Sequence, residues 1–575
     1  MATMSDTNSV YSPVQEAGRI FSLLCGQAER LNLPVEVVEK KDAVSFYSSY
    51  DEIYYPIPFK ETETLAALKG VEGSVAAAIA DLRYGPSPQS RKVRVSLERA
   101  MAFGSQAYMA RVDGLSKLDP EVKKKLKGTD TDLFAAQSNG YRRMSANLYK
   151  TKNEGEFFHI HGSLEATTTL NMIGLDGHRP DLTDYEDIIK VIESRVQKYS
   201  AAELEVMNAE RRQAGVTAFT YEDFIKTPHG KLNVQQPPWK VSSLSGDCPP
   251  TPFPSVRDGS QKILEGVKVL DLCRIIAGPT IARILTEYGA DVLKITSPNL
   301  PDVPFFQLDG NMGKHAADLD LKTEDGRRQF EELLADVDVL VDGYRPGALE
   351  NLGYGPDVLS ALAEKRGKGI VYVSENCFGY EGEWAGRPGW QQIADCVTGV
   401  AWAQGQFMGR STPMVPPFPI SDYGTGCMGA IAALTGLYLR AKNGGSYHGK
   451  ASLMHYDLLL FAAGKYSEAV QEKMRAALPP EFFKLRHCDS VDRISSTALK
   501  IMRTHFPHLY AAGAEAGEDA LTEKWYSKAY NADIEVVRPV CEIDGVDNQF
   551  VRASRPNGYD RPNWTDFKRE EDYKK

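Results

Sequence analysis

Short apolar runs that alternate with helix-like stretches constrain the fold of this chain more than any other feature of its sequence. The runs lie at 267–272, 291–295, 338–341 and 370–374, and stretches such as 280–288 and 324–334 separate them. Strands and helices that alternate in this way are typical of βαβ units and a parallel sheet. Helices cover such a sheet on both faces, so its strands read as continuous apolar runs. We therefore expect an α/β fold with a doubly wound parallel sheet, whose ligands bind beyond the carboxyl ends of the strands.

An internal repeat adds a second constraint. Residues 73–103 align without a gap with residues 429–459, at a constant offset of 356. Both stretches contain a helix rich in small residues, a polar turn and a strand that enters Ser-Leu. Two Ala-rich helices can coincide by chance, but the shared order of elements favours a partial internal duplication. At the same offset Asp422 corresponds to Ala66, so a duplicated chain would keep one such carboxylate and one active site.

Length and charge restrict the classes of function. A chain of 575 residues exceeds what one hydrophobic core usually supports, so we expect two or more domains. Its 67 Lys and Arg against 77 Asp and Glu give a net charge of -10, which leaves no electrostatic footprint for nucleic acid or an anionic membrane. We expect no nucleic-acid and no membrane partner, and any anionic ligand must be bound by local groups.

The cysteines and the start of the chain bear on the compartment. The eight cysteines are scattered, without a CxxC pair or the His spacing of a zinc site. The chain starts without the pattern of a signal peptide and contains no apolar stretch near ~18 residues. These features predict a soluble protein with reduced thiols in the cytoplasm. His159 and His161 share one face of a probable strand, but no supporting ligand accompanies them, so we expect no metal.

Five ordered sequence blocks carry a resemblance to a known family. They are LEGVKVLDLCRIIAGP (264–279), YGADVLKITSP (288–298), GKHAADLDLKTEDGR (313–327), VLVDGYRPGALENLGYG (339–355), and GRPGWQQIADCVTG (386–399) followed by SDYGTG (421–426). In this order the blocks resemble the family III CoA-transferases, also called CaiB/BaiF, which include formyl-CoA transferase, carnitine CoA-transferase and the α-methylacyl-CoA racemases.

The resemblance implies an architecture. It predicts a Rossmann-like sheet with a smaller α+β domain, and the N-terminal half resembles the distal half of the same family, including the strand FFHIHG. The expected regions are a partial family copy with the small domain at 1–230, a linker at 231–262, a Rossmann-like CoA-binding and catalytic domain at 263–462, and a helical wrapping segment at 463–575. Because family members form interlocked dimers, we expect either a homodimer or an intrachain pseudo-dimer.

The resemblance also assigns a catalytic role to Asp422. It implies that Asp422 attacks an acyl-CoA thioester, and that CoA then passes through an aspartyl thioester to a carboxylic acid. Covalent catalysis of this kind divides one transfer into easier steps, and it implies the CoA thioester as substrate with no tightly bound cofactor. Gly424 and Gly426 predict an oxyanion environment, because their missing side chains allow a close approach to backbone N–H groups. The alternative for Asp422 is an N-cap on a helix from about Cys427.

The residues expected to bind CoA follow from the same blocks. They are Ile276, Ala277, Lys294, Lys314, Tyr344, Arg345 and Trp390. The lysines and Arg345 suit phosphates and Tyr344 suits stacking, although each side chain has solvation at the surface as its alternative. Trp390 occupies the position where racemases of the family carry a catalytic histidine, so a transferase is favoured. An acyl-CoA isomerase of the same superfamily and a non-catalytic CoA-binding scaffold remain the alternatives.

Overall fold

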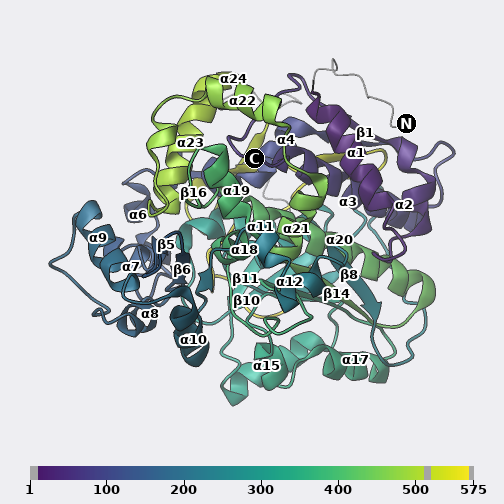
Figure 1. Ribbon diagram of the computed structural model, residues 1–575. Coiled ribbons are helices and arrows are strands. Elements are labelled where there is room, and N and C mark those ends of the chain that lie inside the picture. The colour runs from purple at the N-terminus through teal and green to yellow at the C-terminus, as the bar shows by residue number, and fades with distance from the viewer. Residues whose placement is uncertain (1–10, 511–519, 569–575) are drawn as a thin grey trace.

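The computed structural model describes residues 11–510 and 520–568 (Figure 1). A seven-stranded sheet with the order β11-β10-β9-β12-β13-β14-β8 forms its centre. The strands are β8 (Trp239–Ser243), β9 (Lys268–Leu272), β10 (Asp291–Thr296), β11 (His315–Asp318), β12 (Val339–Asp342), β13 (Val371–Asn376) and β14 (Tyr447–Ser452). All neighbours pair in parallel except β8, which is antiparallel to β14. The predicted α/β fold with a parallel sheet is confirmed.

Helices cover both faces of this sheet, as a doubly wound fold requires. They are α13 (Ala277–Glu287) and α20 (Ile420–Asn443) on one face, and α15 (Glu324–Leu334) and α17 (Pro356–Lys365) on the other. Val269 and Val341 pack into the core shared with α13 and α20. Leu270 and Leu340, one residue away along the same strands, pack with α15 and α17, which lie along the lower edge of Figure 1. Alternate strand residues therefore bury opposite faces.

The two aligned repeat segments adopt corresponding structures. The first forms α3 (Glu61–Tyr84), β2 (Val93–Ser96) and α4 (Leu97–Gly104), and the second forms α20, β14 and α21 (Leu453–Ala463). β2 lies between a parallel strand, β1 (Val44–Tyr47), and an antiparallel strand, β17 (Cys541–Ile543). β14 likewise lies between parallel β13 and antiparallel β8. Helices α3 and α20 pack against each other at the centre of the molecule.

Strand exchange interlocks the regions of the chain. β8 comes from the segment 231–262, expected as a linker, and completes the edge of the central sheet. β17 comes from the C-terminal region, 463–575, and completes the sheet of the N-terminal region, 1–230. The C-terminal strands β15 (Thr522–Ser527) and β16 (Ala532–Val537) also extend β3 (Arg111–Val112). The central sheet and two sheets of the N-terminal region, those that contain β2 and β3, therefore each contain a strand supplied from elsewhere in the chain.

A small unit lies beside the central sheet, on the left of Figure 1. It contains the antiparallel strands β5 (Ala146–Lys150), β6 (Phe157–His161) and β7 (Val216–Thr217), with the helices α9 (Tyr185–Val196) and α10 (Ala201–Arg211). Ile160, Ile192 and Leu204 belong to its separate core. Across the described residues, no helix has both the length and the apolar character needed to cross a bilayer.

Candidate active site

Two cavities meet at the carboxyl ends of the parallel strands. The larger has a volume of about 320 Å³ and the smaller about 100 Å³. The residues that line both are Ser163, Leu164, Ile275, Ile276, Trp390 and Asp422. Ligands of open α/β sheets bind at this edge, so the position agrees with the expectation from the strand pattern. Among the described residues, Asp422 is the only carboxylate in the wall that the two cavities share.

Asp422 lies in the first turn of α20. The helix begins at Ile420, so Asp422 is inside it and does not cap a helix that starts near Cys427. Within the described part of the chain no hydrogen bond reaches its carboxylate, which leaves the oxygens available to a substrate. Burial, and to a smaller extent the negative charge of Asp457, raise the pKa of Asp422 to about 8.

Gly424 and Gly426 allow α20 to pack closely against its neighbours. Both are buried inside the helix, and neither lines either of the two cavities described above. A Cβ on Gly424 would lie 1.9 Å from the Tyr456 ring, and one on Gly426 would lie 2.5 Å from Cβ of Thr280. The expected oxyanion role is therefore corrected: these glycines are needed because α21 and α13 leave no room for a side chain.

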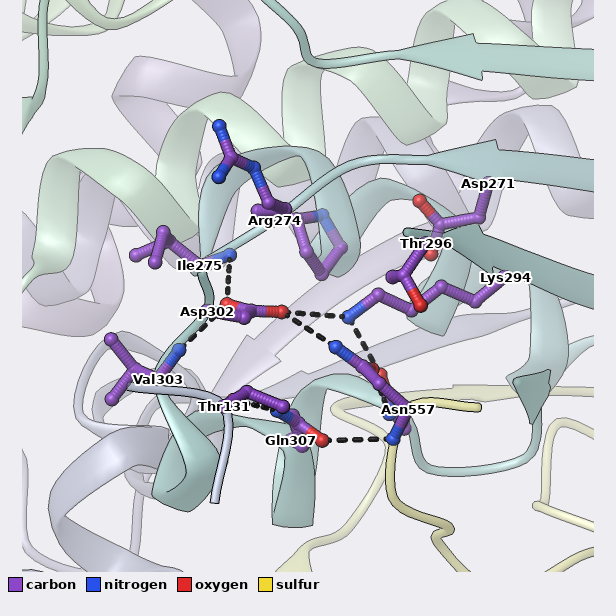
Figure 2. Close-up of polar contacts among 12 residues, drawn as sticks. Thr131, Asp271, Arg274, Ile275, Lys294, Thr296, Asp302, Val303, Gln307 and Asn557 are labelled. Atoms are coloured by element: carbon purple, nitrogen blue, oxygen red, sulfur yellow. Dashed lines mark hydrogen bonds and ion pairs between the residues drawn. The ribbon is translucent and has the colours of Figure 1, made fainter. Parts of the chain in front are cut away.

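The loop between β9 and α13 separates the cavities, and its backbone is strained there. Ile275 has φ of +73°, a region that β-branched residues rarely adopt. Asp302 holds this loop, as Figure 2 shows: its Oδ1 accepts the N–H of Ile275 at 3.3 Å and the N–H of Val303 at 2.8 Å. Its Oδ2 contacts Lys294 Nζ at 3.4 Å and Asn557 Nδ2 at 2.9 Å. Asp302 is thus a positioning residue for the loop.

Lys294 and Lys314 lie in the interior and do not line either cavity. Lys294 is 2% exposed and bonds to Asp302 and to Asn311 Oδ1 at 3.0 Å. Lys314 is fully buried and donates to Asp271 Oδ2 and to the Pro279 carbonyl, both at 2.7 Å. The expectation that these lysines meet CoA phosphates is therefore corrected, because their charges already balance buried carboxylates.

Arginine side chains give the larger cavity a cationic wall. Arg274 and Arg345 line it together, and the Arg274 guanidinium lies 5.5 Å from the centre of the Tyr344 ring. Arg345 donates to the Arg212 carbonyl at 3.3 Å, and Arg274 donates to the Pro301 carbonyl at 2.8 Å. Among the described residues neither arginine has a carboxylate partner. Unneutralised guanidinium groups of this kind suit phosphate.

Trp390 joins the central region to a loop of the N-terminal region. Its indole Nε1 donates to Ser163 Oγ at 2.9 Å, and its ring stacks on His161 at 5.6 Å between centres. The Ser163 N–H donates to His161 Nδ1 at 3.0 Å. Burial holds the pKa of His161 well below its usual range, so the neutral ring carries its proton on Nε2. The N-terminal region therefore builds part of the site, with Ser163 itself at φ of +54°.

Glu375 is a site residue that the sequence analysis missed. It lies near the end of β13 and lines the larger cavity with Asp422. Burial raises the pKa of Glu375 to about 8, and the charges of Asp422 and Asp342 act in the same direction. Its place after the apolar run 370–374, at the carboxyl end of a parallel strand, is a signal that could have identified it.

The expected residues thus divide into two groups. The larger cavity brings together Ile276, Ala277, Tyr344, Arg345, Trp390 and Asp422. Lys294, Lys314, Gly424 and Gly426 form the second group, which lines neither cavity. Residues from distant segments join them, including Gly162–Glu165 in the larger cavity and Lys117 and Arg143 in the smaller. Their distance from Asp422 in the sequence left no local pattern that would reveal them.

Comparison with known proteins identifies the family. The sequence model of CoA-transferase family III matches residues 264–478. "Acetyl-coenzyme A transferase nodX" of Hypoxylon pulicicidum is 32% identical over 560 residues, 94% of this chain and 91% of that protein. An "Acyl-CoA transferase" of Gibberella moniliformis is 33% identical over 70% of this chain and 71% of that protein. The "Succinyl-CoA--L-malate CoA-transferase beta subunit" of Chloroflexus aurantiacus is 34% identical over 33% of this chain and 49% of that protein. The chain therefore belongs to CoA-transferase family III, and it is a CoA-transferase whose substrate is a CoA thioester.

Proposed function

We propose that this protein exchanges CoA between an acyl-CoA and a carboxylic acid through a covalent intermediate on Asp422. In this proposal CoA occupies the larger cavity and the exchanged acid occupies the smaller. The observation that carries it is the position of Asp422 in the wall common to both cavities. A nucleophile at that point can reach a thioester whose CoA and acyl portions extend in different directions.

The transfer divides into displacements that balance. A carboxylate oxygen of Asp422 attacks the thioester carbonyl, the C–S bond breaks, and a mixed anhydride and CoA thiolate form. The thiolate attacks the aspartyl carbonyl of the anhydride and releases the donor acid, which leaves an aspartyl-CoA thioester. The acceptor carboxylate then repeats these steps in reverse order, so that its own CoA thioester departs and Asp422 is free again. Each step replaces one leaving group on an acyl carbon, a thiolate or a carboxylate, with another.

The surroundings of Asp422 support this role. Arg274 and Arg345 are proposed to bind the phosphates of CoA, because both line the larger cavity and neither guanidinium group has a carboxylate partner among the described residues. Tyr344, which lines the same cavity, is proposed to stack on the adenine. Ile276 and Ala277 are proposed to contact the CoA chain where α13 begins. Trp390, fixed by its bond to Ser163, is proposed to position the thioester between the cavities.

A trapping experiment tests the intermediate. Acetyl-CoA is the first donor to try, because a relative that aligns over most of the chain is named an acetyl-coenzyme A transferase. After incubation with acetyl-CoA and cleavage by hydroxylamine, mass spectrometry of the Asp422 peptide should show the hydroxamate. Asp422→Asn should abolish this modification, whereas Asp325→Asn, at an exposed position on α15, should leave it unchanged. If a panel of acyl-CoA donors modifies no peptide, or modifies Asp422→Asn equally, the proposal fails.

A further inference from the structure

The smaller cavity has a cationic wall supplied by the N-terminal region. Lys117 and Arg143 line this cavity together with Asp422. Their side chains are 17% and 18% exposed, so both charges are largely removed from water. A charge in such a position is costly unless it is paired. The partners of these two cations therefore indicate what the cavity is built to hold.

One carboxylate serves both cations. Asp492, in α23 (Val491–His505), contacts Lys117 Nζ with Oδ1 and lies 3.5 Å from Arg143 Nε with Oδ2. Within the described residues the terminal guanidinium nitrogens of Arg143 have no hydrogen-bond partner. Two cations and one anion leave one positive charge unbalanced at this wall. The group thus has the charge and the free donors to accept a second carboxylate.

Other contacts fix the position and charge of Lys117. Its Nζ lies 4.7 Å from the ring centre of Tyr108 and 5.5 Å from that of Phe306. Burial lowers the pKa of Lys117, but Asp492 and Tyr108 outweigh this effect and raise it above the ordinary value, so the amine is charged. Val303 and Val415 contribute apolar surface to the same cavity. The cavity therefore combines a cationic wall with apolar walls and the carboxyl of Asp422.

The volume restricts the length of the ligand. The smaller cavity has a volume of about 100 Å³, against about 320 Å³ for the larger cavity. On this difference in size we expect the smaller cavity to favour a short acid over a long acyl chain. An acid that places one carboxyl group at Asp422 and a second at the cationic wall would contact all three of these charged lining residues.

We propose that at least one of the two exchanged acids is a short dicarboxylic acid, whose second carboxylate pairs with Arg143 and Lys117. The inference rests on the proposed function, because Asp422 must react with the other end of the acid. Arg143 and Lys117 then determine specificity: an acid of equal length with a methyl group at the far end leaves their positive charge unpaired. The second carboxylate of the acid supplies the negative charge that Asp492 alone does not provide for Lys117 and Arg143.

Binding to the full-length Asp422→Asn protein tests the inference without turnover. Succinate and butyrate have four carbons each and differ at one end, so titration calorimetry with both acids isolates the second carboxylate. We expect succinate to bind about tenfold or more tightly than butyrate. Arg143→Met and Lys117→Met should each remove most of this difference by weakening succinate. Lys124→Met removes a charge from an exposed side chain and should leave the difference intact.

The outcomes separate this inference from the covalent mechanism. Equal binding of succinate and butyrate, or equal weakening of both by Arg143→Met, would overturn the dicarboxylate assignment even if Asp422 is trapped in the wild-type protein. A tenfold preference for succinate would support the subsite even if no adduct forms. Arg143→Lys keeps the charge and should retain most of the preference. This variant, and the wild-type comparison of the two acids as acceptors by kcat/KM, decide the question if Arg143→Met does not fold.

Discussion

At the scale of single residues, the proposed mechanism makes the reaction depend on the ionisation of Asp422. Only the carboxylate form is nucleophilic, and burial raises the pKa of this group to about 8. Most sites are therefore protonated at neutral pH, and kcat/KM for the acyl-CoA should rise with pH and level off above about pH 8. Initial rates measured at pH values below and above 8, with the acid acceptor at fixed concentration, define this rising limb of the pH profile. A profile that falls as pH rises through 8 would contradict the assignment.

A substitution at Asp457 should shift the pH at which the rate rises. Asp457 accepts hydrogen bonds from Ser421 Oγ at 2.8 Å and Thr398 Oγ1 at 3.0 Å, and its negative charge raises the pKa of Asp422. Asp457→Asn keeps an oxygen acceptor and removes the charge, so the pKa of Asp422 should fall. The rising limb of the pH profile should then shift to lower pH, with little change in the plateau rate. An unshifted limb would show that Asp457 does not affect the ionisation of Asp422.

At the scale of elements, the packing of α20 determines where Asp422 lies. Gly424 is two residues from Asp422, and a methyl group there would lie 1.9 Å from the Tyr456 ring. Gly424→Ala should lower the free energy of unfolding by about 1–3 kcal/mol and reduce kcat, because α20 must move away from α21. Urea denaturation and steady-state rates measure both effects. Gly128→Ala is the control, since no atom lies within 4 Å of its Cβ, and it should change neither.

The elements themselves were largely predictable from the sequence. The apolar runs 267–272, 291–295, 338–341 and 370–374 predict β9, β10, β12 and β13, because a strand covered on both faces needs apolar residues throughout. Charged residues within these elements are harder to interpret. Lys294 is a strand residue whose partner Asp302 lies in a loop, and no local pattern distinguishes this buried pair from a phosphate ligand.

At the scale of the whole molecule, the site depends on contacts between distant regions. Asp422 was predictable from its sequence block, whereas Lys117, Arg143 and Ser163 enter the site only through the interlocked fold. Contacts between residues that lie roughly 300 positions apart leave no periodic pattern in the sequence from which they could be predicted. The resemblance to an interlocked pair predicted that the two halves would meet, but it did not identify which side chains they would contribute.

The exchange of β8 and β17 makes a prediction about the chain as a whole. β8 precedes the turn at Asp258 and Gly259 but completes the central sheet, whereas β17 follows that turn but pairs with β2. If the chain is divided between these two exposed residues, each fragment lacks one edge strand and part of each cavity wall. Co-expressed fragments 1–258 and 259–575 should therefore purify as one complex and retain transferase activity. Either fragment alone should be inactive and prone to aggregate, because an unpaired edge strand is left exposed. Activity of 259–575 alone would show that the N-terminal region is not needed to complete the site.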